Sequence, residues 1–257
     1  KGYQPWSAML RKAGYYATNN SKTDYNFVHD MKKLWDASSR KASWRNRPDK
    51  EMPFFHMQSF AHSHESSLHF SKGAMDSQKT GHDPAKVRLA PYFPDTQTFR
   101  YTHARYLDRI EVIDEQIGAV IDKLREDGLL EDTFVFYFGD HGGVLPRGKG
   151  YAYESGLHVP LVIRIPENFK HLTDHERVTR TDGFVSFIDF GPTVLNLAGL
   201  KANPLCDGRA FLGKGTSVKE LSSRDEAFGY ADRFDEKYDL VRFLRKGRYS
   251  YLRNLQG

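Results

Sequence analysis

Apolar residues recur at steps of three and four between residues 100 and 127, which is the spacing of a long amphipathic helix. Gly128 follows the last of them and fits the end of that helix. Shorter helices are predicted over residues 7–13 and 184–197. The positions that carry the long repeat are Leu107, Ile110, Ile113, Ile117, Val120, Ile121 and Leu124.

Compact apolar runs separate these helices. Residues 53–60 and 133–138 are predicted to be buried strands, and residues 159–165 form another apolar strand that stops at Pro166. Strands that alternate with helices are typical of an α/β sheet covered by helices. Residues 66–98, in contrast, have little periodicity. We expect them to form a long surface excursion that helps to decide specificity.

The pattern changes after about residue 212. Short β-prone segments on both sides of a turn predict a hairpin in a small antiparallel subdomain. We therefore divide the chain into an α/β domain over residues 1–212 and an antiparallel subdomain over residues 213–257. Because the chain starts without methionine and stops just after a strand-like run, we expect the domain and the subdomain to be parts of a larger protein. The β-prone segments are residues 227–230, 240–244 and 249–252.

The composition is that of a globular protein without a membrane span. Of the 257 residues, 39% are hydrophobic and 28% charged, which argues against a disordered chain. No apolar run reaches the length of a membrane-spanning helix. The net charge of +5 favours an anionic partner, but a scattered positive charge suits nucleic acid, anionic lipid or a sulfated polymer equally well. Cys206 is the single cysteine, so no disulfide can form within the chain.

A first candidate site follows the strand at residues 133–138. Asp140 stands where this strand ends and the run Gly139-Asp140-His141-Gly142-Gly143 begins. Ligands of open α/β sheets collect beyond the carboxyl ends of the strands, and a carboxylate there suits a hard cation. By itself, the run is explained equally well as an ordinary Asp turn followed by a surface histidine.

A second candidate site lies a few residues further along. Lys149 stands between Gly148 and Gly150, and the loop continues to Gly156. A lysine flanked by glycines can reach a bound oxyanion. Taken alone, however, a solvated basic loop is the simpler interpretation.

Several short motifs in a fixed order, from about residue 10 to residue 254, together resemble the sulfatase family. In that family a strand leads to an Asp-Asn or Asp-His pair, followed by Gly-Lys-Gly, Tyr-Glu-x-Gly and a Val-Pro strand. The helix over residues 100–127 and a later Asp-x-x-Pro-Thr helix match as well. The matching residues are Asp140-His141-Gly142, Gly148-Lys149-Gly150, Tyr153-Glu154, Gly156, Val159-Pro160, Asp189 and Pro192-Thr193.

The resemblance implies an α/β fold of the alkaline-phosphatase-like type, with a sandwiched mixed or parallel sheet and a small antiparallel C-terminal subdomain. It also implies that a formylglycine, made from Cys or Ser in a Cys/Ser-x-Pro-x-Arg motif, attacks the sulfur of a sulfate ester. A divalent cation, usually Ca2+, holds the sulfate oxygens. In this chain Asp140 and His141 would be metal ligands, and Lys149 would bind the sulfate and stabilise charge on the transferring group.

Three further residues follow from the same resemblance. The run at residues 53–60 resembles a strand that leads to a histidine near the leaving group, and this position falls on His64, with His62 as its neighbour on the substrate side. A histidine-rich loop without a catalytic role is the alternative. Lys22 matches a lysine that contacts both nucleophile and sulfate, whereas Asp24 stands where many members have histidine.

Part of the family's machinery is not found in this sequence. No Cys/Ser-x-Pro-x-Arg motif occurs, and Cys206 is followed by Asp207-Gly208-Arg209, so we predict that it is a structural thiol, buried or half-buried. The paired N-terminal aspartates that complete the metal site are also missing. Because Ca2+ takes six to eight oxygen ligands, we expect the chain by itself to bind metal weakly and to be inactive.

We therefore predict a parent protein that is a sulfuric ester hydrolase, acting on a sulfated carbohydrate. The alternatives are a phosphoester or phosphonate hydrolase of the same superfamily and a non-catalytic protein that binds anionic glycans. Nucleic acid is not expected as a partner, because the sequence has no basic helix and no stacking-aromatic motif. Sulfated polymers lie outside the cytoplasm, so a periplasmic or secreted location is expected.

Overall fold

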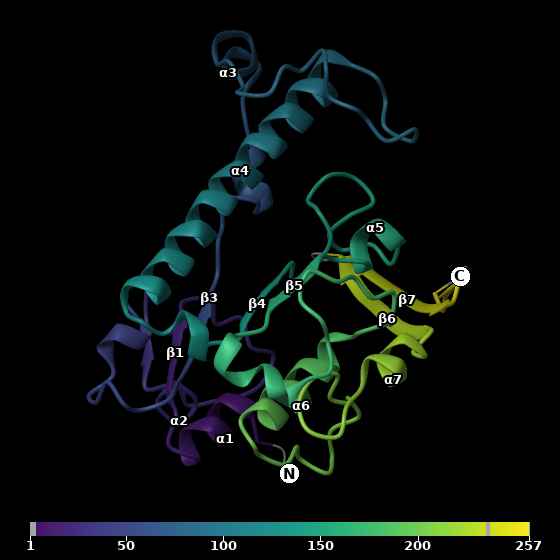
Figure 1. Cartoon of the computed structure of the whole chain (residues 1–257). Helices are drawn as coiled ribbons and strands as arrows, with labels where there is room; N and C mark the ends of the chain where they lie inside the picture. Colours follow the sequence, from purple (N-terminus) through teal and green to yellow (C-terminus); the bar gives the residue numbers. More distant parts are fainter. Residues whose placement is uncertain (1–3, 235–236, 257) are drawn as a thin grey trace. The chain divides into compact units, whose positions relative to one another are not determined.

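The computed structural model describes residues 4–234 and 237–256, and its contacts divide the chain into two compact units. Unit 1 consists of residues 1–59 and 171–227, and unit 2 of residues 60–170 and 228–257. Each unit is described by itself below, and Figure 1 labels their helices and strands. The division predicted at residue 212 stays a prediction.

Unit 1 contains a parallel three-stranded sheet in the order β2-β1-β3. Its strands are β1 (Tyr16–Asn20), β2 (Ala37–Ser38) and β3 (Phe54–Gln58), and Thr18 is paired with Ala37 on one side and His56 on the other. Two helices, α1 (Trp6–Lys12) and α2 (Met31–Leu34), accompany this sheet. The parallel strands confirm the α/β prediction for this part of the chain.

The central strand β1 is buried, and α1 packs against it. Ala17, Thr18 and Asn19 have no exposed surface, and Ala17 packs with Leu34 and Trp35 in a small apolar core. Burial on both faces is usual for a strand inside a parallel sheet. The predicted burial of residues 53–60 is wrong, since β3 is half-buried: it pairs with β1 alone, and its other edge has no partner strand among the described residues.

The second part of unit 1 carries short helices around a buried carboxylate. They are η5 (Phe187–Asp189), α6 (Phe190–Leu197) and α7 (Val218–Ser222). The helix predicted from residue 184 begins only at residue 187, because Ser186 is extended and forms a capping box with Asp189. Cys206 is half-buried, with its thiol 3.9 Å from the carbonyl oxygen of Ile188, as expected for a structural thiol.

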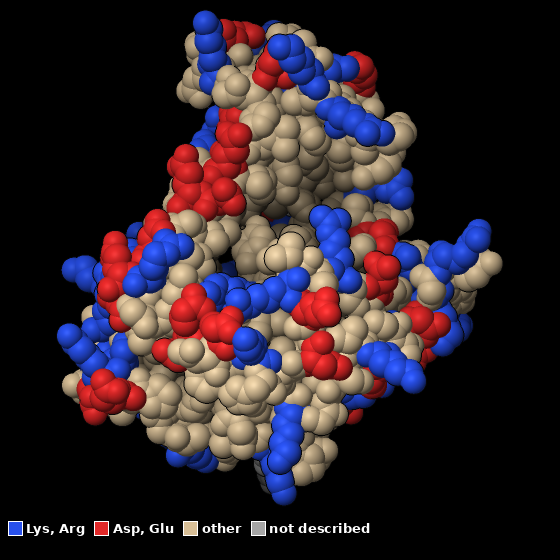
Figure 2. All heavy atoms as spheres, in the orientation of Figure 1, with Lys and Arg blue, Asp and Glu red and all other residues tan. Residues whose placement is uncertain are grey.

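Unit 2 is built around the long helix α4 (Gln97–Glu126), which confirms the predicted amphipathic helix. Thr96 caps its start by accepting a hydrogen bond from the backbone N–H of Phe99 at 3.2 Å, and Gly128 follows its end at a φ of +71°. Exposed acidic side chains gather along α4, as Figure 2 shows. They are Glu111, Asp114, Glu115, Asp122 and Glu126.

Two strands follow α4, after the short turn η3 (Leu130–Asp132): β4 (Val135–Phe138) and β5 (Leu161–Arg164). They are antiparallel, with Phe136 paired with Ile163. The prediction that residues 133–138 are buried is wrong, since β4 is half-buried. The reason is that other elements cover only part of its side-chain surface, and an apolar run does not show how much of a strand is covered.

The C-terminal strands form a small sheet in the order β6-β7-β8. They are β6 (Glu226–Phe234), β7 (Lys237–Lys246) and β8 (Tyr249–Asn254), and β7 and β8 make the predicted hairpin, with Lys246 opposite Tyr249. Short helices complete the description: η1 (Trp44–Asn46), η2 (Glu65–Leu68), α3 (Lys72–Ser77), α5 (Glu154–Leu157) and η4 (Glu167–Leu172). Among the described residues, no helix, α4 included, is long and apolar enough to cross a membrane.

Candidate functional site

The Asp140-His141 pair lies directly beyond the end of β4, as the sequence predicts for a ligand-binding turn. The Nδ1 atom of His141 lies 2.7 Å from the carbonyl oxygen of Gly142, and a carbonyl can only accept, so Nδ1 carries the proton of the neutral ring. The other ring nitrogen, Nε2, then offers its lone pair. It lies 3.6 Å from Oδ1 of Asp140.

This pair has the geometry of two ligands of one cation. Ligands at right angles around Ca2+, each about 2.3–2.6 Å from the ion, lie roughly 3.3–3.7 Å apart, and the Asp140–His141 separation of 3.6 Å falls within that range. A backbone carbonyl that fixes the tautomer of a ligating histidine is the usual outer support of such a ligand. Two ligands are fewer than Ca2+ requires, so further oxygens would have to complete its coordination.

Glycines bring the loop of Lys149 against the loop of Asp140. The backbone N–H of Gly142 donates to the carbonyl oxygen of Gly156 at 2.8 Å, and that of Lys149 donates to Gly143 at 2.9 Å. A Cβ on Gly142 would lie 1.9 Å from the carbonyl oxygen of Ser155, which no side chain can tolerate. The close approach of the two loops therefore requires glycine.

The ammonium of Lys149 is bound to a carboxylate that the sequence analysis did not single out. Its Nζ lies 2.8 Å from Oε2 of Glu65, the first residue of η2, and the two side chains are 30% and 48% exposed. The hydrogen bond from Lys149 lowers the pKa of Glu65, and the charges of Lys149, His64 and His141 lower it further, although partial burial opposes them. Lys149 therefore contacts this carboxylate directly, and the charges of His64 and His141 act on its pKa.

His64 is oriented by the start of η2. Its Nδ1 accepts a hydrogen bond from the backbone N–H of Ser66 at 3.3 Å and lies 3.0 Å from the hydroxyl of the same residue. Because Nδ1 accepts, the proton of the neutral ring is on Nε2, on the side away from this cap. His62 lies two residues earlier, and its carbonyl oxygen accepts from the Ser67 hydroxyl at 2.6 Å.

Lys22 belongs to unit 1, just after β1. Its Nζ is 3.8 Å from Oδ2 of Asp24, and both side chains are at least half exposed. Within unit 2, Lys149 thus contacts Glu65, the residue after His64, and Asp140 lies beside His141. Lys22 is in the other unit, and its predicted role is untested by these contacts.

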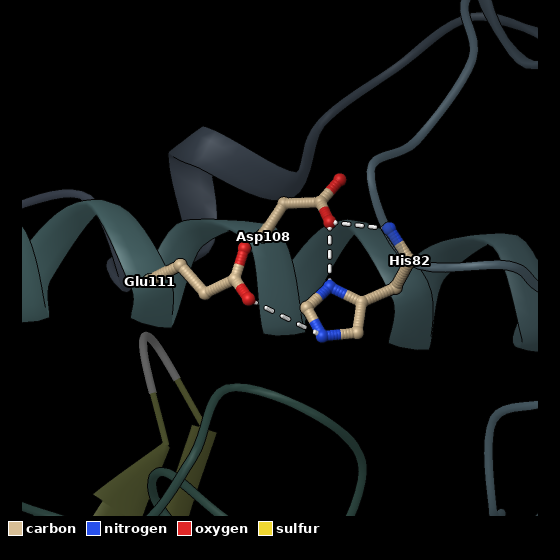
Figure 3. A group of neighbouring side chains, drawn as sticks. All are labelled: His82, Asp108 and Glu111. Carbon is tan, nitrogen blue, oxygen red and sulfur yellow. Dashed lines mark hydrogen bonds and ion pairs between the residues drawn. The ribbon is translucent and has the colours of Figure 1, made fainter.

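A second cluster in unit 2 joins the excursion before α4 to the helix itself (Figure 3). Oδ1 of Asp108 lies 2.8 Å from Nδ1 of His82 and accepts the backbone N–H of the same residue at 2.9 Å, while Oδ2 accepts from Gly81 at 3.0 Å. Burial raises the pKa of Asp108, but these hydrogen bonds outweigh it and lower the pKa overall. On the other side of the ring, Nε2 of His82 is 3.6 Å from Glu111.

This cluster was missed by the sequence analysis, and the available signal was a pair of carboxylates three residues apart on a helix. Ligand atoms of His82, Asp108 and Glu111 lie within 4.8 Å of one another, close enough for one metal ion. However, Asp108 is already engaged in hydrogen bonds to both residues 81 and 82. The contacts therefore support a role in fixing the excursion to α4.

Comparisons with known proteins give a consistent answer. The family model for sulfatases matches residues 3–200. An ulvan-active sulfatase from Formosa agariphila is 38% identical over 279 residues, which cover 96% of this chain and 45% of that protein. The chain thus spans about half the length of this relative.

Solved structures with low sequence identity share the fold. A phosphonate monoester hydrolase from Silicibacter pomeroyi superposes with a TM-score of 0.71 at 18% identity, over 98% of this chain and 71% of that one. A protein solved with its substrate D-glucosamine-2-N,6-O-disulfate gives 0.64 at 15% identity, over 97% and 72%. The predicted α/β fold of the alkaline-phosphatase-like type is therefore confirmed.

Proposed function

This chain belongs to the sulfatase family, and from that premise we propose that the protein of which it forms part hydrolyses sulfate esters of a carbohydrate. The observation that carries the proposal is the Lys149–Glu65 ion pair at 2.8 Å, on a loop that packs against the Asp140-His141 turn. A lysine that holds a carboxylate can hold an oxygen of a sulfate ester in the same way.

In the proposed reaction each residue has a definite role. Lys149 donates hydrogen bonds to sulfate oxygens and stabilises the charge that develops on them. The Nε2–H of His64 lies on the side of the ring away from its cap and can donate a hydrogen bond to the departing sugar oxygen. Asp140 and Nε2 of His141 would hold a divalent cation, proposed to be Ca2+, which when bound adds a fixed positive charge beside the sulfate.

Two parts of the proposal rest on the family resemblance. Lys22 would contact the nucleophile and the sulfate, and His62 would contact the substrate beside His64. The nucleophile itself, a formylglycine in other members of the family, would come from a Cys/Ser-x-Pro-x-Arg motif, which this sequence does not contain.

A sulfated carbohydrate as substrate is supported by the similarity to the ulvan-active sulfatase, which extends over 96% of this chain. The net charge of +5 agrees with a polyanionic substrate. Sulfated polymers lie outside the cytoplasm, so we also propose that the protein is periplasmic or secreted.

A phosphoester or phosphonate hydrolase is the second candidate, because a phosphonate monoester hydrolase shares the fold with a TM-score of 0.71. The two activities use the same tetrahedral anion, and the residues described here fit both. The two activities are distinguished by assaying the complete protein, supplied with Ca2+, on a sulfated oligosaccharide and a phosphate monoester in parallel. Sulfate release supports the proposal, and phosphate release without sulfate release overturns it.

The role of Lys149 is tested in the same assay. The Lys149→Ala variant is expected to lose about 10²- to 10³-fold in kcat/KM with an unchanged fold, because it removes one charged donor from the transition state. Lys170→Ala is the matched control, since Lys170 is also an exposed lysine that is paired with a glutamate, Glu167, in unit 2. Equal activity of the two variants would remove Lys149 from the site.

A further inference from the structure

A cavity of about 340 Å³ lies beside the loop of Lys149, inside unit 2. Its walls come from the end of the excursion, from α4 and from the loop that carries Lys149. In this loop, Gly143 and Gly148 line the cavity. Lys149 follows Gly148 directly and is hydrogen-bonded to Gly143. The cavity thus borders the proposed sulfate site, and its volume is in the range of about 300–1,000 Å³ that is usual for small-ligand sites.

The wall formed by residues 88–93 is fixed to α4 at two points. Arg100 donates to the carbonyl oxygens of Ala85 and Val87 at 3.2 and 3.3 Å and forms an ion pair with Asp95. Further back, Asp108 holds the backbone of residues 81 and 82, as Figure 3 shows for His82. These contacts lie before and after residues 88–93 in the sequence, and they hold this wall in place before any ligand binds.

One arginine lines this cavity, and a second lies beside it. The guanidinium of Arg147 is 4.6 Å from the ring centre of Tyr92, a lining residue, and 4.3 Å from that of Tyr153. Its neighbours Pro146 and Gly148 line the cavity. Arg88 is an exposed lining residue, and neither arginine has an acidic partner among the described residues.

The inner wall combines aromatic surface with a few polar groups. His103 and Tyr106 project from the same face of α4, three residues apart. The Nδ1 atom of His103 is buried and has no hydrogen-bond partner among the described residues. Burial lowers the pKa of His103, so its ring is neutral near neutral pH and can exchange hydrogen bonds with a hydroxyl.

We propose that this cavity binds the sugar residue next to the sulfated one, and that it selects a neighbour that carries a carboxylate or a second sulfate. The inference rests on the proposed function, since the cavity adjoins the loop of Lys149. Aromatic rings suit the apolar faces of a pyranose, and His103 suits a hydroxyl. The guanidinium of Arg88 on the lining, and that of Arg147 stacked on the lining residue Tyr92, offer N–H donors to an anionic substituent.

The test uses the complete protein and three matched sulfated oligosaccharides. Their sugars next to the sulfated residue are uncharged, carboxylated or sulfated. The wild type is expected to show a KM about tenfold lower for a charged neighbour than for the uncharged one. Arg147→Ala and Arg88→Ala are expected to remove this preference, and the response to the two charged substrates identifies which anion is recognised.

Two variants sharpen the result. Arg147→Lys keeps the charge but loses the planar stacking, so it should recover only part of the preference. Arg125→Ala, on the exposed part of α4 where Arg125 pairs with Asp122, should keep the full preference. Equal KM values for all three substrates in the wild type would overturn the inference, as would arginine variants that retain the preference.

A binding measurement separates this inference from the proposed function. Titration calorimetry with an unsulfated, carboxylated oligosaccharide needs no turnover. Binding that is lost in Arg147→Ala supports the cavity even if no sulfate ester is cleaved, in which case only the proposed function fails. Sulfate release without any such binding, and without the KM preference, overturns the cavity and leaves the proposed function standing.

Discussion

Each unit of the chain contains a carboxylate that gathers cationic groups, and the two carboxylates differ in how far water can reach them. In unit 1, Asp189 is 7% exposed and accepts hydrogen bonds from the backbone N–H groups of Ser186 and Arg209 at 2.9 and 2.8 Å. Arg224, 3.8 Å away, is 6% exposed. In unit 2, Glu65 and Lys149 remain accessible to solvent.

This difference separates a structural role from a functional one. Both carboxylate oxygens of Asp189 accept backbone N–H groups and the side chain is buried, so this carboxylate is engaged within the fold. Removing one partner from a buried ionic network leaves an uncompensated charge, whereas an exposed pair contributes little to stability. The Glu65 cluster can therefore exchange its carboxylate for another anion.

The largest effect is expected from Asp189→Ala. The substitution leaves two backbone N–H groups and part of the Arg224 charge without a partner, and should lower the free energy of unfolding by about 3–5 kcal/mol. Denaturant unfolding of the complete protein measures the loss. Glu65→Ala is the matched comparison and should cost no more than about 1 kcal/mol. Similar losses in the two variants would erase the distinction between the clusters.

The next effect concerns the metal. Asp140→Ala removes one of the two proposed ligands, so the Ca2+ concentration that gives half-maximal sulfatase activity should rise at least about 10- to 100-fold, while thermal stability without metal stays the same. Activity as a function of Ca2+ concentration gives the answer. Asp114→Ala, an exposed acid on α4, is the control. An unchanged Ca2+ requirement in Asp140→Ala would place the metal elsewhere.

A smaller effect is expected from Asp108→Ala, which frees residues 81 and 82 from α4. The cavity wall would then be less well fixed, and we expect KM for a sulfated polysaccharide to rise about three- to tenfold with little change in kcat, because binding suffers before chemistry. Amide exchange of residues 80–93 should increase at the same time. A fall in kcat without a change in KM would contradict this role.

The smallest effect is expected from Glu65→Gln, because the Lys149–Glu65 pair is half exposed. The folded-state pKa of Glu65 is lowered below its ordinary value, so its contribution to stability is present above about pH 4.5 and is lost as the pH falls through the folded pKa. Screening by water limits this contribution to about 0.2–1 kcal/mol. Unfolding free energies of the wild type and Glu65→Gln should converge at acidic pH, and a difference that grows there would contradict the assignment.

The sequence predicted the regular elements better than their burial. The spacing from Leu107 to Leu124 locates α4, and the glycines around Lys149 mark a loop that packs closely on its neighbour. Burial of β4 could not be read from its apolar run, because burial depends on which elements cover a strand.

The sequence pattern also could not predict contacts between distant segments. Glu65 meets Lys149 across more than eighty positions, and His82 meets Asp108 between a loop and a helix. Neither pair lies at a spacing that a local pattern specifies. The family resemblance points to His64 and Lys149 as site residues, which stays a prediction, but it does not point to Glu65, the carboxylate that Lys149 contacts.

The most direct test of the site is a crystal structure of the complete protein with Ca2+ and a bound sulfated product. We predict a cation about 2.3–2.6 Å from Asp140 and close to Nε2 of His141. We also predict a sulfate that accepts a hydrogen bond from Lys149 in place of Glu65. A sulfate bound far from Lys149, or a cation bound away from Asp140 and His141, would contradict the site described here.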